Sequence, residues 1–501
     1  MSILEAIGFF EAYSLKHELD EVGSPIVRQI LKRLALLNEM ELQYLTLDRK
    51  VQHLSAGELQ RVRFARQLGN PLSGLLYIFD EPCRHLHPKQ VDLVIKTLKS
   101  ICASGNTVFV VEHDIRVIQA ADYLVEVGPG AGELGGEILQ AGPAKQVLQV
   151  KDSLNGAFLR GEASVYRPEA RRAMDTSGLL RLTAFGAEGE APSEYKFPLD
   201  ALSVITGPSG SGKSTLLREG ILESSERLLR KEPSADNYIV EFDRGIESVK
   251  LIDQSPLGQN ARSTPATATG VFDGVRKLFA ALPEAKARGY GQGRFSFNSK
   301  DGRCALCKGY GYLTVEMHFL PDVEAQCSAC LGSRYGDDTL EVRFKGYSIA
   351  DVLNMSVDSA LQVFLSVPEI AIRLKTLKEV GLGYLLLGQP AASLSGGEAQ
   401  RVKLSAELAK QYKGRTLYLL DTPSGGLHSK DIDLLMQLLH SLVEKGNTVL
   451  LIENTPSILM SADWCIEIDV DASSEGRSRI VATGSPEDLI GNSESLIRQY
   501  L

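Results

Sequence analysis

Short apolar runs alternate with longer amphipathic stretches along much of this chain. The runs have the length of buried strands, and the clearest four are LLYIFD (75–80), NTVFVVE (106–112), TLYLLD (416–421) and NTVLLIE (447–453). The stretches between them have helical periodicity, and two helices are expected to open at LSAGE (54–58) and LSGGE (394–398). Because strands that alternate with helices form parallel sheets, the pattern predicts an α/β fold.

Four blocks of the sequence occur twice, at an almost constant offset of about 340 residues. Residues 54–68 match 394–408, 77–89 match 418–430, 105–114 match 446–455, and 121–127 match 462–468. Chance does not preserve the order and spacing of four blocks. We therefore expect two lobes of one architecture, with a polar linker containing Gly and Pro at 151–175 between them.

A phosphate-binding loop precedes the second copy. The segment LSVITGPSGSGKSTLL (202–217) combines a β-branched strand, the pattern G-x-x-x-x-G-K-S and the start of a helix. Backbone N–H groups of such a loop surround phosphates, its Lys reaches the outer phosphates and its Ser hydroxyl binds Mg²⁺. The residues expected to bind ATP and Mg²⁺ are Gly207, Ser209, Gly210, Ser211, Gly212, Lys213, Ser214 and Thr215. The counterpart in the first copy would fall before residue 1, so we expect that lobe to lack a phosphate loop.

Length and composition indicate a globular protein. With 501 residues, 44% of them hydrophobic, the chain can bury sizeable cores in two to four domains. It contains no stretch of about 18 apolar residues, so neither a membrane span nor a signal peptide is expected, and a cytoplasmic location without a membrane partner follows. The net charge of -9 argues against a globally basic nucleic-acid binder but leaves local basic patches open.

LSGGE resembles the signature motif of ATP-binding cassette (ABC) proteins, and LSAGE is a near copy. In that superfamily the signature of one lobe closes over the nucleotide that the other lobe holds. The resemblance therefore implies nucleotide contacts from Ser55, Gly57, Ser395, Gly396 and Gly397. A lone LSxGE segment also fits a helix N-cap with Glu at the third position, but two copies in register with the strands favour the signature.

Two further positions match ABC proteins, and two depart from them. Gln254 resembles the glutamine that senses Mg²⁺ and water, and Asp421 resembles the aspartate that supports Mg²⁺. Thr422 follows Asp421 where the superfamily has Glu, and Asn454 replaces a histidine. Hydrolysis needs a carboxylate that orients and deprotonates water, and its loss costs about 10² to 10⁴ in rate. We therefore expect ATP binding with slow turnover.

The first copy has the opposite set of residues. It keeps Glu81 and His113, the candidate catalytic pair, in a lobe for which no phosphate loop is expected. A phosphate loop and its Glu belong to the same lobe, so the two copies do not combine into one complete hydrolytic centre. A second polypeptide that supplies the missing half would restore activity.

Four of the seven cysteines form the pairs Cys304-x-x-Cys307 and Cys327-x-x-Cys330, separated by 19 residues. This spacing is typical of a zinc site in which two short loops hold one tetrahedral Zn²⁺. A redox CxxC pair is the alternative, but two pairs on either side of a hairpin-like segment favour metal. With four thiolates and no open position, the site is expected to be structural.

Longer runs around these cysteines, at 252–280, 283–307 and 314–335, resemble the UvrA family of bacterial nucleotide excision repair. In that family a zinc-bearing insert lies between the Q-loop and the signature. The resemblance covers about residues 176 to 490, and more weakly 1 to 150. Relative to the family, we expect the first phosphate loop, the UvrB-engaging domain, the first zinc module and the first insertion domain to be missing.

Nine basic and three acidic residues lie between Arg262 and Lys308. In the UvrA family this region faces DNA, so the resemblance implies contacts to the phosphates of damaged or distorted double-stranded DNA. The residues expected to make them are Arg262, Arg288, Arg294, Lys300 and Arg303. A solvated charged face is the alternative. Phe295, Phe297 and Phe319 are expected to be core aromatics rather than wedges between bases.

The resemblance implies an α/β fold of two ABC-type P-loop NTPase lobes, the first incomplete, with helical signature subdomains and a zinc-binding insert. The expected parts are signature subdomain I (1–70), partial lobe I (71–150), the linker (151–175), lobe II (176–258 and 401–501) and signature subdomain II (259–400) with its zinc module (304–330). The expected function is DNA damage recognition with ATP as a conformational ligand. A homodimer, UvrB or a second UvrA-like chain are the implied partners. The alternatives are an ATPase completed by a second polypeptide and a regulatory or protective DNA-binding protein outside repair.

Overall fold

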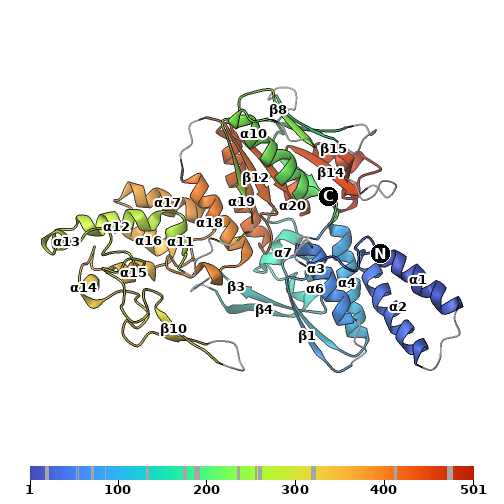
Figure 1. Cartoon of the computed structure of the whole chain (residues 1–501), viewed down its shortest axis with the longest axis horizontal. Helices are drawn as coiled ribbons and strands as arrows, with labels where there is room; N and C mark the ends of the chain where they lie inside the picture. The colour runs from blue at the N-terminus through green and yellow to red at the C-terminus, as the bar shows by residue number, and fades with distance from the viewer. Residues whose placement is uncertain are drawn as a thin grey trace. The chain divides into compact units, whose positions relative to one another are not determined.

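The computed structural model describes residues 1–501 apart from positions 17–21, 52–53, 55, 69–72, 85, 131, 133–134, 173–177, 186–191, 234–236, 254, 256, 258–261, 318–322, 411–413 and 471–477. The chain divides into two compact units. Figure 1 shows the whole chain, coloured by residue number from the N-terminus to the C-terminus. The first unit comprises Met1–Val125, Gln140–Leu251 and Gly414–Leu501. The second unit comprises Glu126–Leu139 and Ile252–Lys413.

A six-stranded sheet with the order β15-β14-β7-β13-β12-β9 carries the second copy of the repeat. Its strands are β7 (Leu202–Thr206), β9 (Ser248–Ile252), β12 (Thr416–Asp421), β13 (Thr448–Ile452), β14 (Trp464–Val470) and β15 (Ser478–Gly484). The pairs β12–β13, β13–β7 and β7–β14 are parallel, and β15 is antiparallel to β14. Every residue of β7 and β13 is buried, as expected for the continuous apolar runs of a parallel sheet.

An antiparallel sheet with the order β6-β5-β8 packs against the same core. Its strands are β5 (Leu179–Ala184), β6 (Ser193–Pro198) and β8 (Tyr238–Phe242). Leu182 and Phe197 from this sheet share one hydrophobic cluster with Ile205, Leu419 and Ile466 from the six-stranded sheet. The later helices of this part are α19 (Ser429–Glu444), α20 (Pro456–Leu459), α21 (Pro486–Gly491) and the short 3-10 helix η5 (Arg498–Tyr500).

The first copy of the repeat contains two strand pairs. These are the parallel pair β1 (Leu76–Asp80) and β2 (Thr107–Val111), and the pair β3 (Tyr123–Gly128) and β4 (Glu137–Pro143). Its helices are α1 (Ile3–Lys16), α2 (Gly23–Glu39), α3 (Ala56–Leu68), α4 (Pro88–Ala103), α5 (Ile115–Ala120) and α6 (Ala144–Val147). Helices α1 and α2 lie side by side (Figure 1), and Ile3, Leu34, Phe64 and Val94 contribute to a core shared with α3 and α4.

The burial predicted for the apolar runs of the first copy is wrong on one face. Alternate residues of β1 and β2 are exposed, namely Leu76 (58%), Ile78 (71%), Phe109 (60%) and Val111 (54%). In the second copy the corresponding residues pack against the sheet β6-β5-β8 and against residues 216–221, which follow the phosphate loop; they are Leu417, Leu419, Leu450 and Ile452. Among the described residues no such layer covers this face of β1 and β2.

The described part of the second unit is mainly helical and includes the hairpin β10–β11. The hairpin pairs β10 (Tyr312–Val315) antiparallel with β11 (Val323–Gln326). The helices are α11 (Pro265–Ala268), α12 (Val271–Ala281), α13 (Pro283–Ala287), α14 (Asp337–Leu340), α15 (Ile349–Leu353), α16 (Val357–Phe364), α17 (Pro368–Glu379), the short 3-10 helix η4 (Ala391–Ser393) and α18 (Gly396–Leu408). Phe295 and Phe297 are fully buried, so they are core aromatics as expected, while Phe319 lies outside the described residues.

The stretch at 151–172 packs against the second copy. It contains the helix α7 (Leu154–Leu159). The Tyr166 N–H donates to Asp433 Oδ1 at 2.7 Å, and Arg172 Nη1 pairs with the buried carboxylate of Asp463 at 3.0 Å. This polar segment is therefore held in place by specific contacts.

Within the described ranges, no helix has both the length and the apolar content that crossing a membrane requires.

Candidate nucleotide site and metal centre

The phosphate-binding loop joins the buried strand β7 to a long helical segment. Gly207, Gly210 and Gly212 have φ values of 144°, 88° and 84°, which residues with a Cβ rarely adopt. Ser214 and Thr215 are exposed at the start of the helix. The helical segment runs through α9 (Lys213–Thr215), the π-helix η3 (Leu216–Glu223) and α10 (Ser224–Arg230). The loop therefore has the glycine-dependent turn and the helix N-terminus that phosphate binding requires.

Lys213 is buried and folded back onto this loop. Its Nζ donates to the carbonyl oxygens of Gly207 and Pro208, at 2.6 Å each. Burial lowers the pKa of Lys213 to about 7, against the opposing effect of the Asp421 carboxylate. A bound triphosphate would supply negative charge beside this buried ammonium group. The arrangement therefore suits an anionic ligand.

Asp421 is the last residue of β12, Thr422 follows it, and Asn454 lies just after the end of β13. The Thr422 hydroxyl lies 3.4 Å from Asp421 Oδ1. Asn454 is buried, and its Oδ1 accepts hydrogen bonds from Thr206 Oγ1 at 3.0 Å and from the Gly207 N–H at 3.1 Å. The Asn454 amide thus anchors the first residue of the phosphate loop, and position 422 carries a hydroxyl where a general base would stand.

The signature helix of the first copy lies against the same loop. A Cβ added at Gly57 in α3 would lie 2.8 Å from Ser209 Oγ. A Cβ added at Gly210 would lie 2.6 Å from Tyr44 Oη, which donates a 2.6 Å hydrogen bond to the buried Glu58. Both glycines therefore allow a close approach between the first copy and the loop of the second.

Glu81 and His113, the candidate catalytic pair of the first copy, line a cavity of about 110 Å³. Thr422 and Asn454 line the same cavity from the second copy. The Glu81 carboxylate pairs with Arg84 Nη1 at 3.1 Å. The structure thus brings Glu81 and His113 to the same cavity as their counterparts Thr422 and Asn454. The charge of Glu81 is already paired.

The second signature segment belongs to the second unit, where Ser395 caps α18. Its Oγ accepts from the Glu398 N–H at 3.2 Å, and Glu398 Oε2 accepts from the Ser395 N–H at 2.8 Å. Gly396 and Gly397 form the first turn of the helix. This capping box is the helix N-cap that the sequence analysis gave as the alternative to a signature motif. Two expected nucleotide ligands lie outside the described residues: Ser55 and Gln254.

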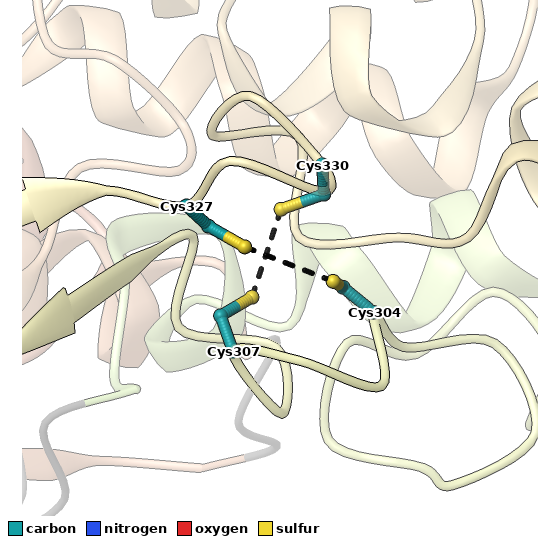
Figure 2. A group of neighbouring side chains, drawn as sticks. All are labelled: Cys304, Cys307, Cys327 and Cys330. Atoms are coloured by element: carbon teal, nitrogen blue, oxygen red, sulfur yellow. Dashed lines mark hydrogen bonds between the residues drawn. The ribbon is translucent and has the colours of Figure 1, made fainter.

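Four cysteine side chains converge in the second unit, as Figure 2 shows. Their sulfur atoms all lie within 4.8 Å of one another, with 3.9 Å between Cys304 and Cys327 and 3.6 Å between Cys307 and Cys330. Tetrahedral zinc with Zn–S bonds of about 2.3 Å separates its sulfur ligands by about 3.8 Å. A disulfide would bring two sulfurs to about 2.05 Å. The cluster therefore fits one Zn²⁺.

Each CxxC pair ends in the same tight turn. Lys308 and Gly309 have positive φ values of 52° and 87°, and Leu331 and Gly332 have values of 46° and 86°. The Gly311 N–H lies 3.3 Å from Cys307 Sγ and donates to it, a contact that stabilises a thiolate. The hairpin β10–β11 joins the two turns, so two matching loops present their sulfurs to one ion.

Two of the arginines expected to contact DNA stack on aromatic rings. The Arg262 guanidinium lies 4.3 Å from the Tyr310 ring centroid, and that of Arg294 lies 4.6 Å from the Tyr290 centroid. Stacking fixes the position of a guanidinium group. The N–H groups of both arginines also have partners in the protein: Arg262 Nη1 lies 3.5 Å from Asn298 Oδ1, and Arg294 donates to the Asp301 carbonyl oxygen at 2.6 Å and pairs with Asp338 at 3.3 Å.

The other members of this set differ in exposure. Arg288 pairs with Glu284 at 2.9 Å and with Glu341. Lys300 is exposed, and Arg303 is partly buried. The set is therefore a group of partly paired cations around the cysteine cluster within the second unit.

Two glutamates, the buried Glu453 and the partly buried Glu112, were not singled out from the sequence. Glu453 Oε1 accepts from the Ser424 N–H at 2.8 Å, and Glu112 Oε1 accepts from the Cys83 N–H at 2.6 Å. Burial raises the pKa of Glu453. Each glutamate directly follows the second strand of its copy, β2 or β13, and binds the loop that follows the first strand, β1 or β12. The repeat contained the signal, because VVEHD and LIENT place Glu112 and Glu453 at the same position.

Comparison with known proteins connects this site to a family. No protein-family model matches the chain. The UvrABC system protein A of Staphylococcus epidermidis is 46% identical over 503 residues, which cover 100% of this chain and 53% of that protein. The crystal structure of UvrA2 from Deinococcus radiodurans is similar with a TM-score of 0.90 and 40% identity, over 100% of this chain and 62% of that one.

A more distant likeness concerns the fold alone. A chain in the crystal structure of the complex of archaeal ribosomal stalk protein aP1 and archaeal ribosome recycling factor aABCE1 has a TM-score of 0.50 and 19% identity, over 98% of this chain and 72% of that one. The α/β ABC ATPase fold predicted from the sequence is thereby confirmed. This chain spans about half the length of the curated relatives that it matches. Identity of this extent along the whole chain shows that the protein belongs to the UvrA family of ABC ATPases.

Proposed function

We propose that this protein is a DNA-binding member of the UvrA family in which ATP acts as a conformational ligand and is hydrolysed slowly. The proposal rests chiefly on the composition of the site around the loop at 207–214. This site has a phosphate loop with a buried Lys213, but Thr422 and Asn454 stand where a general base and a histidine are expected. Asn454 is committed to the loop backbone as a hydrogen-bond acceptor.

The test is ATP binding and hydrolysis on one zinc-loaded preparation, with and without duplex DNA. We expect measurable nucleotide affinity together with phosphate release that is about 10² to 10⁴ slower than that of relatives with a complete site. Lys213→Ala should abolish the binding. Turnover as fast as that of a full-length relative would contradict the proposal.

For DNA, we propose that the cysteine cluster and the surrounding cations form the contact surface. The exposed Lys300 and the stacked Arg262 and Arg294 support this role. The ion pairs of Arg288 and Arg294 do not prevent it, because exposed ion pairs contribute little to stability and phosphates can displace them. Such contacts give sequence-independent affinity for distorted duplex, as repair of damaged DNA requires.

A triple variant tests this surface. Changing Arg294, Lys300 and Arg303 together to Ala should weaken binding to a duplex oligonucleotide and lower the slope of log K against log salt by up to about 3. The matched control is Lys231→Ala, an exposed cation of the first unit, which should leave the slope unchanged. An unaltered slope in the triple variant would remove these residues from the interface.

One observation favours a second candidate, an ATPase completed by another polypeptide. The exposed apolar face of β1 and β2 corresponds to strands whose apolar residues are all buried in the second copy. Glu81, once its carboxylate leaves Arg84, and His113 would serve a nucleotide held by an added phosphate loop. The two candidates are separated by co-purifying the chain with a strand–phosphate loop–helix segment of a longer UvrA-family protein and measuring ATPase activity. Only the ATPase completed by another polypeptide predicts a gain in turnover.

A further inference from the structure

His87 is a fully buried histidine at the N-terminus of the 16-residue helix α4. Its Nδ1 accepts a hydrogen bond from the Lys89 N–H at 3.3 Å. An accepting Nδ1 carries no proton, so the proton of the neutral ring lies on Nε2. This Nε2 is inaccessible to solvent and has no hydrogen-bond partner among the described residues. Buried donors are rarely left without a partner in proteins, so the group needs an explanation.

The ring lies at the phosphate loop of the other copy. Gln90 Oε1 accepts from the His87 N–H at 3.2 Å and from Ser209 Oγ at 3.1 Å. One side-chain oxygen thus ties His87 to the loop. Burial, together with the positive charge of Lys213, lowers the pKa of His87 to about 3. The ring is therefore neutral at physiological pH and offers one N–H donor.

The repeat provides an internal comparison. His428 is the counterpart of His87, caps α19 in the same way and accepts from the Lys430 N–H at 3.2 Å through Nδ1. Its Nε2, however, lies 3.1 Å from Asn155 Oδ1 and is satisfied. The two copies therefore share the cap and differ in the partner of Nε2. The unpartnered donor belongs to the copy that faces the phosphate loop.

We propose that the Nε2–H of His87 donates a hydrogen bond to the γ-phosphate of ATP held by the loop at 207–214. The inference rests on the proposed binding of ATP at this loop. The γ-phosphate is the partner because the first copy contacts the loop through Gly57 and Gln90, and because Lys213, whose charge acts on the His87 ring, reaches the outer phosphates. ADP lacks this group, so His87 distinguishes ATP from ADP.

Two substitutions separate the cap from the donor. His87→Asn keeps an acceptor at the cap position but is too short to place a donor at Nε2, whereas His87→Gln places an amide N–H near Nε2. His428→Asn is the matched control. Equilibrium titrations use fluorescent ATP and ADP analogues in the presence of Mg²⁺ on the full chain.

We expect His87→Asn to lose about tenfold to a hundredfold in ATP affinity, as for a hydrogen bond to a charged group, with ADP affinity within about twofold. His87→Gln should recover part of the loss, and His428→Asn should bind both nucleotides like the unaltered protein. Unchanged ADP affinity shows that the site is folded.

The outcomes distinguish this inference from the proposed function. If His87→Asn keeps the ratio of ATP to ADP affinity while Lys213→Ala abolishes both, the role of His87 is overturned and nucleotide binding stands. If the unaltered protein binds neither nucleotide, the proposed function fails and this inference fails with it.

Discussion

Thr422 has a backbone φ of 47°, and its counterpart Glu81 has a φ of 46°. The N–H of Thr422 donates to the Ile452 carbonyl, and that of Glu81 donates to the Val111 carbonyl, so both residues leave their strands in the same way. A β-branched residue seldom adopts this left-handed conformation, which costs about 1 to 2 kcal/mol. The position therefore retains the backbone that suits a general base although the carboxylate is gone.

This geometry predicts a gain of activity at residue 422. Thr422→Glu would place a carboxylate on a backbone shaped like that of Glu81, and ATP turnover should rise by about 10². Steady-state phosphate release at saturating ATP measures the change. Thr422→Gln is the control, because it has the same length without a carboxylate. Equal rates for the two variants would mean that more than the missing base limits hydrolysis.

His87 also predicts a pH dependence of stability. Its pKa is lowered to about 3 by burial and by the cations Lys213, Arg116 and Lys89, while an unfolded histidine titrates near about 6.5. The neutral ring therefore favours the folded state fully above pH about 6.5, and stability falls as the pH drops from there toward 3, by up to about 1.4 kcal/mol per pH unit.

Urea unfolding of the unaltered protein and of His87→Asn between pH 7.5 and 5.5 measures this contribution. As the pH falls, the unaltered protein should lose more unfolding free energy than His87→Asn, because only the unaltered protein contains the buried ring. Parallel pH profiles would show that the buried ring does not remain neutral in the folded protein.

At the scale of elements, β1 and β2 differ from β12 and β13 in what covers them. Phe79 faces the core and stacks on Phe64 with 4.9 Å between ring centroids, whereas Ile78 and Phe109 point to the exposed face. We expect Ile78→Thr with Phe109→Thr to change the free energy of unfolding by less than about 0.5 kcal/mol and to reduce self-association, since exposed apolar patches promote it.

The core-facing control is Phe79→Ala, which should cost about 2 kcal/mol because it removes a stacked, partly buried ring. Urea unfolding and light scattering report the two effects. A large loss of stability in the double variant would mean that another part of the chain covers this face in solution.

Local patterns were predicted well from the sequence, and properties set by distant partners were not. The two helices that open at LSAGE and LSGGE and the convergence of the paired cysteines followed from spacing, because caps and metal loops are built from neighbouring residues. Burial of one face of β1 and β2 was predicted wrongly, since hydrophobicity does not say whether a further layer packs on that face. The position of His87 beside the phosphate loop involves the contact of Gln90 with Ser209, which joins the two copies. These two residues are far apart in the sequence, so no local pattern predicts the contact.

At the scale of the whole molecule, the phosphate loop and the cysteine cluster belong to different compact units. Lys213, Gly57 and Asp421 lie in the first unit, and Cys304 and Cys327 lie in the second. Each unit has buried apolar side chains of its own, such as Leu419 in the first and Phe364 in the second, so loss of the metal should loosen the hairpin β10–β11 without dismantling the nucleotide site.

Zinc removal tests this separation. We expect one zinc per chain by elemental analysis, and a strong chelator should render the four cluster thiols reactive and abolish duplex binding while ATP affinity stays within about twofold. Cys304→Ser should act like chelation, because three thiolates hold the ion poorly, and Cys102→Ser, a partly buried cysteine outside the cluster, should leave zinc content unchanged. If chelation abolished ATP and DNA binding together, the metal would support both units, and the assignment of separate roles to them would be wrong.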